Sequence, residues 1–204
     1  MYLSKIAIPW GKSQNAYNWH DCLWQLFPHQ PDAKRDFLFR VEHTAVGQGS
    51  QILMQSQREP NPIAVGAKLL AKRDYPLTLK SGQVLRFILV ANPVKTMKDQ
   101  EDPPRKNKKG EVKTCRVPLF KEEQQREWLE RKLLGAARLE SITVQPNLPL
   151  YFRKKDHPPG KIVPVTFEGV LIVDQSIQLE ALIINGIGPA KGFGCGLLSV
   201  ARFR

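Results

Sequence analysis

The fold prediction begins with the run NAYNWHDCLWQLFP (residues 15–28) and with the run RDFLFRVE (residues 35–42) that follows it. Apolar side chains in the first run recur with the spacing of one helix face, at Trp19, Leu23, Leu26 and Phe27. Asn15 is a favourable N-cap and Pro28 follows the last apolar position, so a helix is expected over residues 15–27. In the second run, Phe37, Phe39 and Val41 alternate as on one side of a strand.

The rest of the first half adds strands around this pair. Residues 2–8 are apolar-rich and strand-like, and further short strands are expected at 51–57, 77–79 and 84–90. Residues 61–71 fit a helix and a loop equally well. The order of elements therefore predicts a β-α-β-β-containing unit that ends near residue 90.

The second half repeats this order. Residues 121–134 predict a helix with acidic residues in its first turn, Arg131 and Lys132 in its last turn, and Gly135 at its end. The remaining elements are strands at 141–144, 150–152, 161–173 and 197–203 and a helix at 176–184.

This β-α-β-β-α-β order is typical of a ferredoxin-like fold. We therefore predict an α+β chain with two tandem ferredoxin-like (RRM-like) domains, residues 1–90 and 91–204, each an antiparallel sheet with helices on one face. The polar stretch near residues 96–114 has no periodicity, which predicts a mobile loop in the second domain.

The charge of the chain favours a polyanionic partner. Its 204 residues include 31 Lys and Arg against 19 Asp and Glu, a net charge of +12. Nucleic acid is favoured over a membrane surface, because the sequence has no long basic amphipathic helix and no apolar run of about 18 residues. The start of the chain lacks the features of a signal peptide, so a cytoplasmic location is expected.

Metal and cofactor chemistry is not expected. Cys22, Cys115 and Cys195 are scattered, which argues against a disulfide framework and against a cysteine-rich zinc site. The four histidines show no HxH or HExxH spacing. We therefore predict that the protein binds no metal and no cofactor.

Residues 186–196 contain five glycines in eleven residues. The run lacks the Gly-Lys-Ser/Thr of a Walker loop, and it follows a helix and precedes a strand, unlike a Rossmann turn. Two interpretations remain open, a crowded helix-to-strand connection and a backbone surface that binds phosphates. Lys191 favours phosphate or RNA binding, with Gly188 and Gly194 as candidate contacts.

Candidate catalytic residues lie on the first helix. Tyr17 and His20 are three positions apart, so their side chains are neighbours on the helix surface. Histidine titrates near neutral pH, which suits acid–base catalysis. The alternative is that both residues border the core.

Cations that could follow an RNA backbone cluster around Pro158-Pro159-Gly160 and after the first helix. Around the prolines the alternative is a solvated turn. The candidate RNA-binding cations are Arg153, Lys154, Lys155, Lys161, Lys34 and Arg35.

Several motifs together resemble those of the CRISPR-associated endoribonucleases of the CasE type, which process repeat RNA in type I-E systems. The motifs span nearly the whole chain and lie at residues 1–5, 23–28, 35–39, 91–96, 115–119, 186–191 and 194–199. The departures are the stretch 96–114 and the more basic end Ala201-Arg202-Phe203-Arg204.

The resemblance implies tandem ferredoxin-like domains that bind the stem-loop of CRISPR repeat RNA and cut at the 3′ base of the stem. His20 occupies the place of the catalytic histidine, and Tyr17 matches a tyrosine present in some relatives. The basic loop of the family matches residues 153–161. The resemblance also implies that the protein keeps its product and joins the other protein subunits of the complex called Cascade.

RNA supplies its own nucleophile, the 2′-hydroxyl beside the cleaved phosphate. We therefore expect a metal-independent reaction that leaves a 2′,3′-cyclic phosphate and a 5′-hydroxyl, with His20 as general acid. The rival interpretation is an RNA-hairpin-binding subunit without activity, although the usual RNP aromatic motif is absent.

Overall fold

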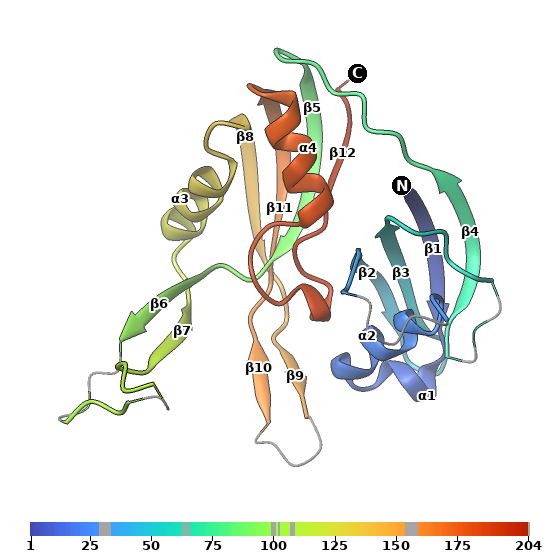
Figure 1. Cartoon of the computed structure of the whole chain (residues 1–204), viewed down its shortest axis with the longest axis horizontal. Helices are drawn as coiled ribbons and strands as arrows, with labels where there is room; N and C mark the ends of the chain where they lie inside the picture. The colour runs from blue at the N-terminus through green and yellow to red at the C-terminus, as the bar shows by residue number, and fades with distance from the viewer. Residues whose placement is uncertain are drawn as a thin grey trace.

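The computed structural model describes residues 1–28, 34–62, 64, 66–98, 101, 103–106, 109–153 and 159–203. It contains two four-stranded antiparallel sheets, each with the strand order of a ferredoxin-like fold (Figure 1). The predicted α+β class with tandem ferredoxin-like units is confirmed. Within these residues no helix is both long enough and apolar enough to cross a bilayer.

The first sheet has the order β2-β3-β1-β4. Its strands are β1 (Tyr2–Ile8), β2 (Phe37–Ala45), β3 (Gly49–Ser56) and β4 (Lys68–Asp74), and its helices are α1 (Trp10–Ser13) and α2 (Ala16–Trp24). The predicted cap of α2 is confirmed, because the Asn15 side chain accepts a hydrogen bond from the Tyr17 amide. The apolar face of α2 is buried, and each fully buried leucine contributes about 1.5–3 kcal/mol.

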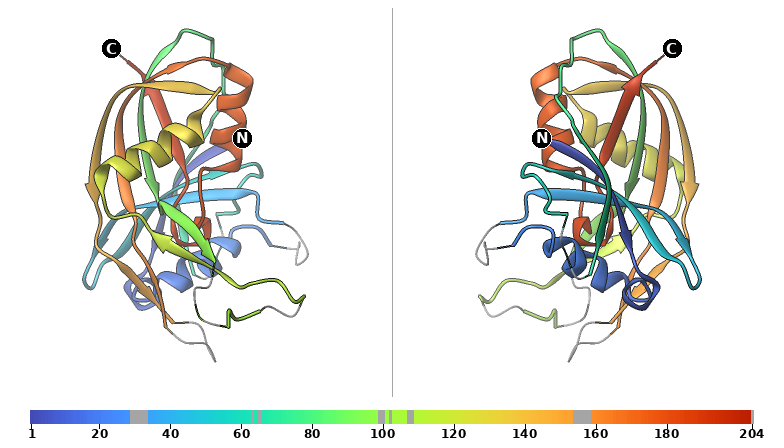
Figure 2. Two further views of the ribbon diagram at one scale, coloured as in Figure 1. Left: turned by 90° about the vertical axis from the view of Figure 1, so that its left-hand side faces the viewer. Right: turned by 90° about the vertical axis from the view of Figure 1, so that its right-hand side faces the viewer.

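The second sheet has the order β12-β5-β11-β8, with its two helices on one face (Figure 2). Its elements are β5 (Val84–Ala91), α3 (Glu122–Leu133), β8 (Ala137–Pro146), β11 (Val165–Val173), α4 (Ser176–Asn185) and β12 (Leu198–Arg202). Residues 84–90 were predicted to belong to the first domain. That placement was wrong, because β5 pairs with β11 and β12, so the chain changes sheet between β4 and β5.

Other differences have local causes. Residues 77–79 form no strand, although Leu77 and Leu79 pack against the apolar core of the second sheet. Residues 61–71 were left open between a helix and a loop, but their end belongs to strand β4. This strand is exposed at the edge of its sheet, where burial imposes little alternation of apolar and polar residues on the sequence. The predicted strand 161–173 is divided into β10 (Gly160–Ile162) and β11.

Two ribbons extend from the end of the molecule where α2 lies (Figures 1 and 2). One pairs β6 (Val94–Lys98) with β7 (Thr114–Pro118), and the other pairs β9 (Leu150–Phe152) with β10. A mobile loop was predicted at 96–114, and this prediction is wrong at both ends of the stretch, which belong to β6 and β7. Within the stretch, Lys106 and Val112 form a further β-bridge. Positions 99, 100, 102, 107 and 108 of that stretch are outside the described residues.

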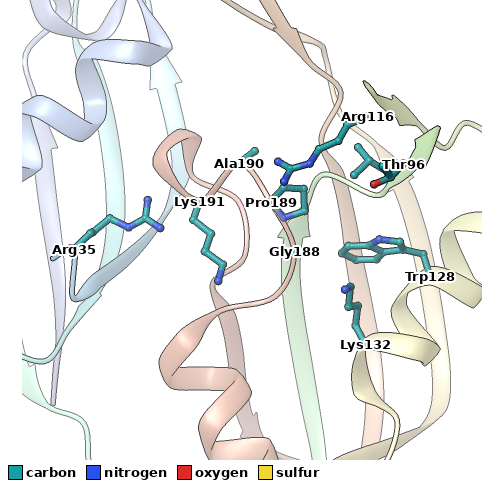
Figure 3. Close-up of a pocket in the computed structure, with 10 residues that line it drawn as sticks. Arg35, Thr96, Arg116, Trp128, Lys132, Gly188, Pro189, Ala190 and Lys191 are labelled. Atoms are coloured by element: carbon teal, nitrogen blue, oxygen red, sulfur yellow. The ribbon is translucent and has the colours of Figure 1, made fainter. Parts of the chain in front are cut away.

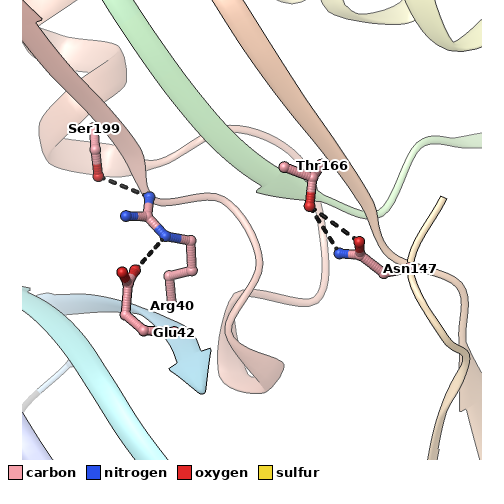
Figure 4. Close-up of polar contacts among 5 residues, drawn as sticks. All are labelled: Arg40, Glu42, Asn147, Thr166 and Ser199. Carbon is pink, nitrogen blue, oxygen red and sulfur yellow. Dashed lines mark hydrogen bonds and ion pairs between the residues drawn. The ribbon is translucent and has the colours of Figure 1, made fainter. Parts of the chain in front are cut away.

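The first four residues of β2 are buried on both faces of the strand. Leu38 and Arg40, which alternate with the predicted core positions, are 4% and 6% exposed. They are covered because the second unit packs on that face. Arg40 donates to Glu42 at 2.7 Å and to Ser199 of β12 at 2.8 Å (Figure 4). Gln55 of β3 donates to the Ile183 carbonyl at 2.8 Å. These polar contacts join the two units.

A second polar pair lies within the C-terminal unit. Asn147 and Thr166 exchange hydrogen bonds of 2.9 and 3.1 Å through their side chains (Figure 4). The pair connects the turn after β8 to the start of β11. In the sequence, the β9–β10 ribbon lies between these two residues. It therefore helps to fix where that ribbon begins.

We expect a double-mutant cycle between Arg40→Met and Ser199→Ala to show coupling. Each single change should lower the free energy of unfolding, by about 1–3 kcal/mol for Arg40 and about 1 kcal/mol for Ser199. The double variant should lose less than the sum, because both changes remove the same hydrogen bond. Urea denaturation measures all four proteins, and strict additivity would contradict the contact.

Candidate functional site

His20 lies on α2 at the boundary between core and solvent. Its side chain is 30% exposed and packs near Trp24 and Phe37, with ring centroids 6.0 and 5.8 Å away. The Trp24 Nε1–H group donates to His20 Nε2 at 3.1 Å, while Nδ1 lies 3.7 Å from an Asp21 carboxylate oxygen. The hydrogen bonding thus assigns the neutral tautomer with its proton on Nδ1.

The surroundings of His20 favour its neutral form. Burial lowers the pKa of the imidazole, and the positive charge of Arg35 lowers this pKa further. Asp21 opposes both effects by raising the pKa, but it does not cancel them. The surroundings therefore favour the neutral imidazole, and an anion bound nearby would favour the protonated form.

Arg35 is a half-buried cation that has no counter-ion among the described residues. Burial lowers its pKa, and within the described residues its guanidinium forms no ion pair or hydrogen bond. The neighbouring Asp36 is already engaged by Arg58, at 2.6 and 2.8 Å. A buried unpaired charge is costly, so a guanidinium in this state is suited to an external anion.

Gly192 brings the backbone of η1 (Lys191–Phe193) against both groups. A Cβ at this position would lie 3.6 Å from Arg35 Nη1 and 3.8 Å from His20 Cδ2. The short 3-10 helix thus lies directly beside the imidazole and the guanidinium, and the absence of a side chain leaves space next to them.

A groove of about 560 Å³ extends from Arg35 along the glycine-rich connection (Figure 3). We call it the basic groove; it is lined by Arg35, Val94, Thr96, Arg116, Trp128, Lys132, Gly188, Pro189, Ala190 and Lys191. Four of these residues are cations and none is acidic. In Figure 3, Arg35 and Arg116 point from opposite sides toward the 188–191 loop.

The pKa of Lys191 shows the electrostatic effect of gathering these cations in one groove. Burial lowers its pKa, and the charges of Arg35 and Lys132 lower this pKa further. Its Nζ donates to the Asn185 carbonyl at 2.7 Å, near the end of α4. The cations of the groove thus repel one another, and an anion bound among them would relieve that repulsion.

The glycine-rich run serves both packing and the groove. Gly194 is buried against Phe39 and Val41, so this candidate RNA contact lies in the packed interior and not in the groove. Gly188 lines the groove with φ of 80°, and a Cβ there would lie 2.9 Å from the Trp128 ring. Ala190 has φ of 63° without being glycine, a conformation that costs roughly 1–3 kcal/mol.

The β9–β10 ribbon is attached to α2 through aromatic rings. Phe152 covers Gly160 and lies 4.3 Å from Phe193 of η1, whose ring is 6.5 Å from that of Tyr17. The Asn15 side chain also donates to the Arg153 carbonyl at 3.1 Å. Tyr17 therefore contacts the ribbon side of η1, and the described residues include no hydrogen bond between Tyr17 and His20.

The structure brings only part of the predicted set together. Arg35, Gly188 and Lys191 line the basic groove, with His20 beside it, while Arg153 and Lys161 are exposed on the ribbon. Lys34 is exposed and is not a groove residue, and Lys154 and Lys155 are outside the described residues. Among the residues the structure describes, no three His, Cys, Asp or Glu side chains are placed to hold a metal ion.

Sequence reasoning missed Arg116 and Lys132. Arg116 belongs to the motif at 115–119, whose basic residue could have been singled out. Lys132 had been assigned to the helix C-terminus, where cations are common, so no local signal distinguished it.

Comparison with known proteins shows the family of this chain. The family model described as CRISPR associated protein matches residues 1–202. The CRISPR system Cascade subunit CasE of Escherichia coli is 46% identical over 201 residues, which cover 98% of this chain and 99% of the relative. This chain belongs to the CRISPR associated protein family. The resemblance seen in the motifs is thereby confirmed.

More distant members and solved structures extend the match. The CRISPR-associated endoribonuclease Cse3 of Thermus thermophilus is 30% identical, covering 98% of this chain and all of the relative. The crystal structure of Cas6e from Escherichia coli superposes with a TM-score of 0.84 at 42% identity, covering both chains fully. A structure of endoribonuclease Cse3 bound to a 19-nucleotide RNA gives 0.77 at 29% identity, covering 98% and 100%.

The pKa of His20 should respond to its two charged neighbours in opposite directions. Arg35→Gln should raise it toward its ordinary value, because a repelling cation is removed. Asp21→Asn should lower it further, because an attracting carboxylate is removed. NMR titration of the imidazole in the RNA-free protein measures both changes, with the exposed His43 as an internal control. A shift in the same direction for both variants would contradict the assigned environment.

Proposed function

We propose that this protein is a metal-independent endoribonuclease that binds the stem-loop of CRISPR repeat RNA and cleaves at the 3′ base of the stem. The observation that carries the proposal is His20 beside the unpaired Arg35 at the end of the basic groove. Relatives named as Cascade subunit CasE and endoribonuclease Cse3, one solved with RNA, support it.

The chemistry requires one proton donor at the leaving group. The ribose 2′-hydroxyl gives its proton to a water molecule as its oxygen attacks phosphorus, a 2′-O–P bond forms, and the P–O5′ bond breaks. His20 donates a proton to the departing 5′-oxygen, which leaves a 2′,3′-cyclic phosphate and a 5′-hydroxyl. General acid catalysis of this kind contributes roughly 10²–10⁴-fold.

RNA binding would itself prepare His20 for this role. A phosphate beside the ring neutralises the effect of Arg35 and raises the pKa of His20, so the imidazole gains a proton. A protonated imidazole has no acceptor nitrogen, so the Trp24 hydrogen bond to Nε2 must break. Nε2–H is then available to the leaving oxygen, while Arg35 stabilises the charge that develops on the phosphate.

The remaining predicted residues fit around this centre. Arg153 and Lys161, with Lys154 and Lys155 beside them in the sequence, would follow the phosphates of the stem. Tyr17, packed on Phe193 at the ribbon side, would orient the attacking 2′-hydroxyl. No metal or cofactor is needed, because the nucleophile belongs to the RNA.

After cleavage the protein would keep the stem-loop product and assemble with the other Cascade subunits, as the name of its Escherichia coli relative indicates. The proposed site of action is the cytoplasm. A protein that binds the hairpin but never cuts it would instead be a structural subunit, and the cleavage assay below distinguishes the two.

His20→Ala should lower single-turnover cleavage of repeat RNA by at least about 10²-fold, because the proton donor is lost. Binding of the hairpin should stay within a few-fold of the wild-type level, because the ribbon and the basic groove supply most of the phosphate contacts. The matched control is His43→Ala, an exposed histidine on β2, which should cleave normally. Excess EDTA should leave the wild-type rate unchanged.

Two results would contradict the proposal in different ways. Loss of wild-type cleavage in EDTA would indicate a metal-dependent reaction. Intact RNA after prolonged incubation with the wild-type protein would leave only the hairpin-binding subunit.

Phe152→Ala should weaken hairpin binding by about 3- to 10-fold, because an aromatic contact of roughly 0.5–1.5 kcal/mol fixes the ribbon on η1. Leu148→Ala, at a neighbouring position that is 86% exposed, serves as the control and should bind normally. Equilibrium filter binding with an uncleavable RNA measures both. Equal affinity of the two variants would show that the ribbon needs no such attachment.

A further inference from the structure

The basic groove begins at Arg35 and extends away from His20 toward the β6–β7 ribbon. We propose that this groove binds the single-stranded RNA that continues on the 3′ side of the cleaved bond, through its phosphates. The inference rests on the proposed function and identifies a second part of the substrate, beyond the stem-loop.

The groove collects positive charge from four separate segments. Arg35 precedes β2, Lys191 lies in η1, Arg116 in β7 and Lys132 in α3. In the part of the chain that the structure describes, none of these four cations forms an ion pair. Asp36, which follows Arg35 in the chain, is engaged by Arg58 at 2.6 Å. Four unpaired cations around one groove match a chain of phosphates.

The floor of the groove is suited to a nucleic-acid backbone. Gly188, Pro189 and Ala190 offer little side-chain bulk, and Ala190 holds the left-handed conformation that turns the loop at this point. Trp128 is 3% exposed and covered by Gly188, so its ring face offers no stacking platform for bases. Contacts to phosphates without base stacking predict binding that is independent of sequence.

The size of the groove favours one strand. A volume of 560 Å³ falls within the range of about 300–1,000 Å³ that small-molecule sites occupy. About one or two nucleotides of a single strand fit such a space, whereas a duplex stem does not. The duplex stem would instead bind along the exposed β9–β10 ribbon.

The position of His20 selects which single strand enters. The β9–β10 ribbon contacts the Tyr17 side of α2, while Arg35 and the groove lie on the His20 side of η1. The strand that carries the cleaved phosphate passes from the stem across His20, so its next phosphates arrive at Arg35. The other strand of the stem begins across the full width of the duplex and has no such continuity with the groove.

The test uses three hairpin RNAs with a 2′-deoxy nucleotide at the cleavage position, so that binding is measured without cutting. One is the stem-loop alone, one adds a 5′ single strand, and one adds a 3′ single strand of equal length. The wild-type protein is compared with the double variant Arg116→Gln/Lys132→Gln. The matched control is Lys95→Gln/Arg131→Gln, one exposed cation of the β6–β7 ribbon and one of α3, neither of which lines the groove.

The wild-type protein should bind the 3′-extended RNA at least about fivefold more tightly than the stem-loop, owing to the added phosphate contacts. The groove variant should lose this advantage, bind the stem-loop within about twofold of wild type, and show a salt dependence lower by about 1.4 in log–log slope for two lost contacts. The control variant should keep the advantage.

Each of the following outcomes overturns the proposal: the advantage follows the 5′ extension, the groove variant retains it, or the stem-loop alone is weakened equally. An unchanged affinity for all three RNAs with loss of binding to a Cascade subunit would assign the groove to an acidic protein surface instead. Cleavage of all-ribose RNA by the wild-type protein is assayed in parallel. Its failure would refute the proposed reaction, whereas the binding comparison tests the groove alone.

Discussion

The site depends on positive charge that is partly withdrawn from water and that forms no ion pair within the described chain. Arg35 and Lys191 are half-buried within a set of mutually repelling cations, and the pKa of each is lowered. Such an arrangement lowers the stability of the folded chain unless packing elsewhere compensates for it. Two separate apolar cores do so, one under α2 and one under α3 and α4. An anion that binds in the groove would remove this electrostatic cost, which would strengthen its binding.

Strand β2 holds the two halves of this arrangement together. Its alternate side chains serve different units: Phe37 and Phe39 belong to the first core, while Leu38 lies against Gly186 and Arg40 bonds to Ser199. Arg35 stands just before this strand, so its position relative to Lys191 is set by the contact between units. Neither ferredoxin-like unit contains the site by itself. The imidazole comes from the first unit, and the loop that faces it comes from the second.

The sequence predicted the parts of this structure that depend on local chemistry. The N-cap at Asn15, the apolar face of α2 and the acid-to-base order along α3 each reflect interactions within a few residues, and all were found as expected. The sheet membership of β5 was predicted wrongly, because a short apolar strand carries no information about which sheet it joins. The β6–β7 ribbon was missed since two exposed strands need no apolar alternation. The meeting of Arg116 and Lys132 with Arg35 depends on tertiary packing, which no sequence window contains. His20 could be named in advance from its chemistry and its motif, but not its hydrogen bond to Trp24.

That hydrogen bond favours the neutral form of His20 in the unliganded protein. The indole N–H occupies the nitrogen lone pair that would otherwise accept a proton, and the surrounding charge keeps the ring from acquiring one. In the proposed reaction, transcripts that collide briefly with the surface would meet a neutral imidazole. His20 would become a proton donor only while a correctly seated strand is bound, so fidelity would depend on dwell time as well as on fit. Such a device would spare other RNAs of the cell without any inhibitor.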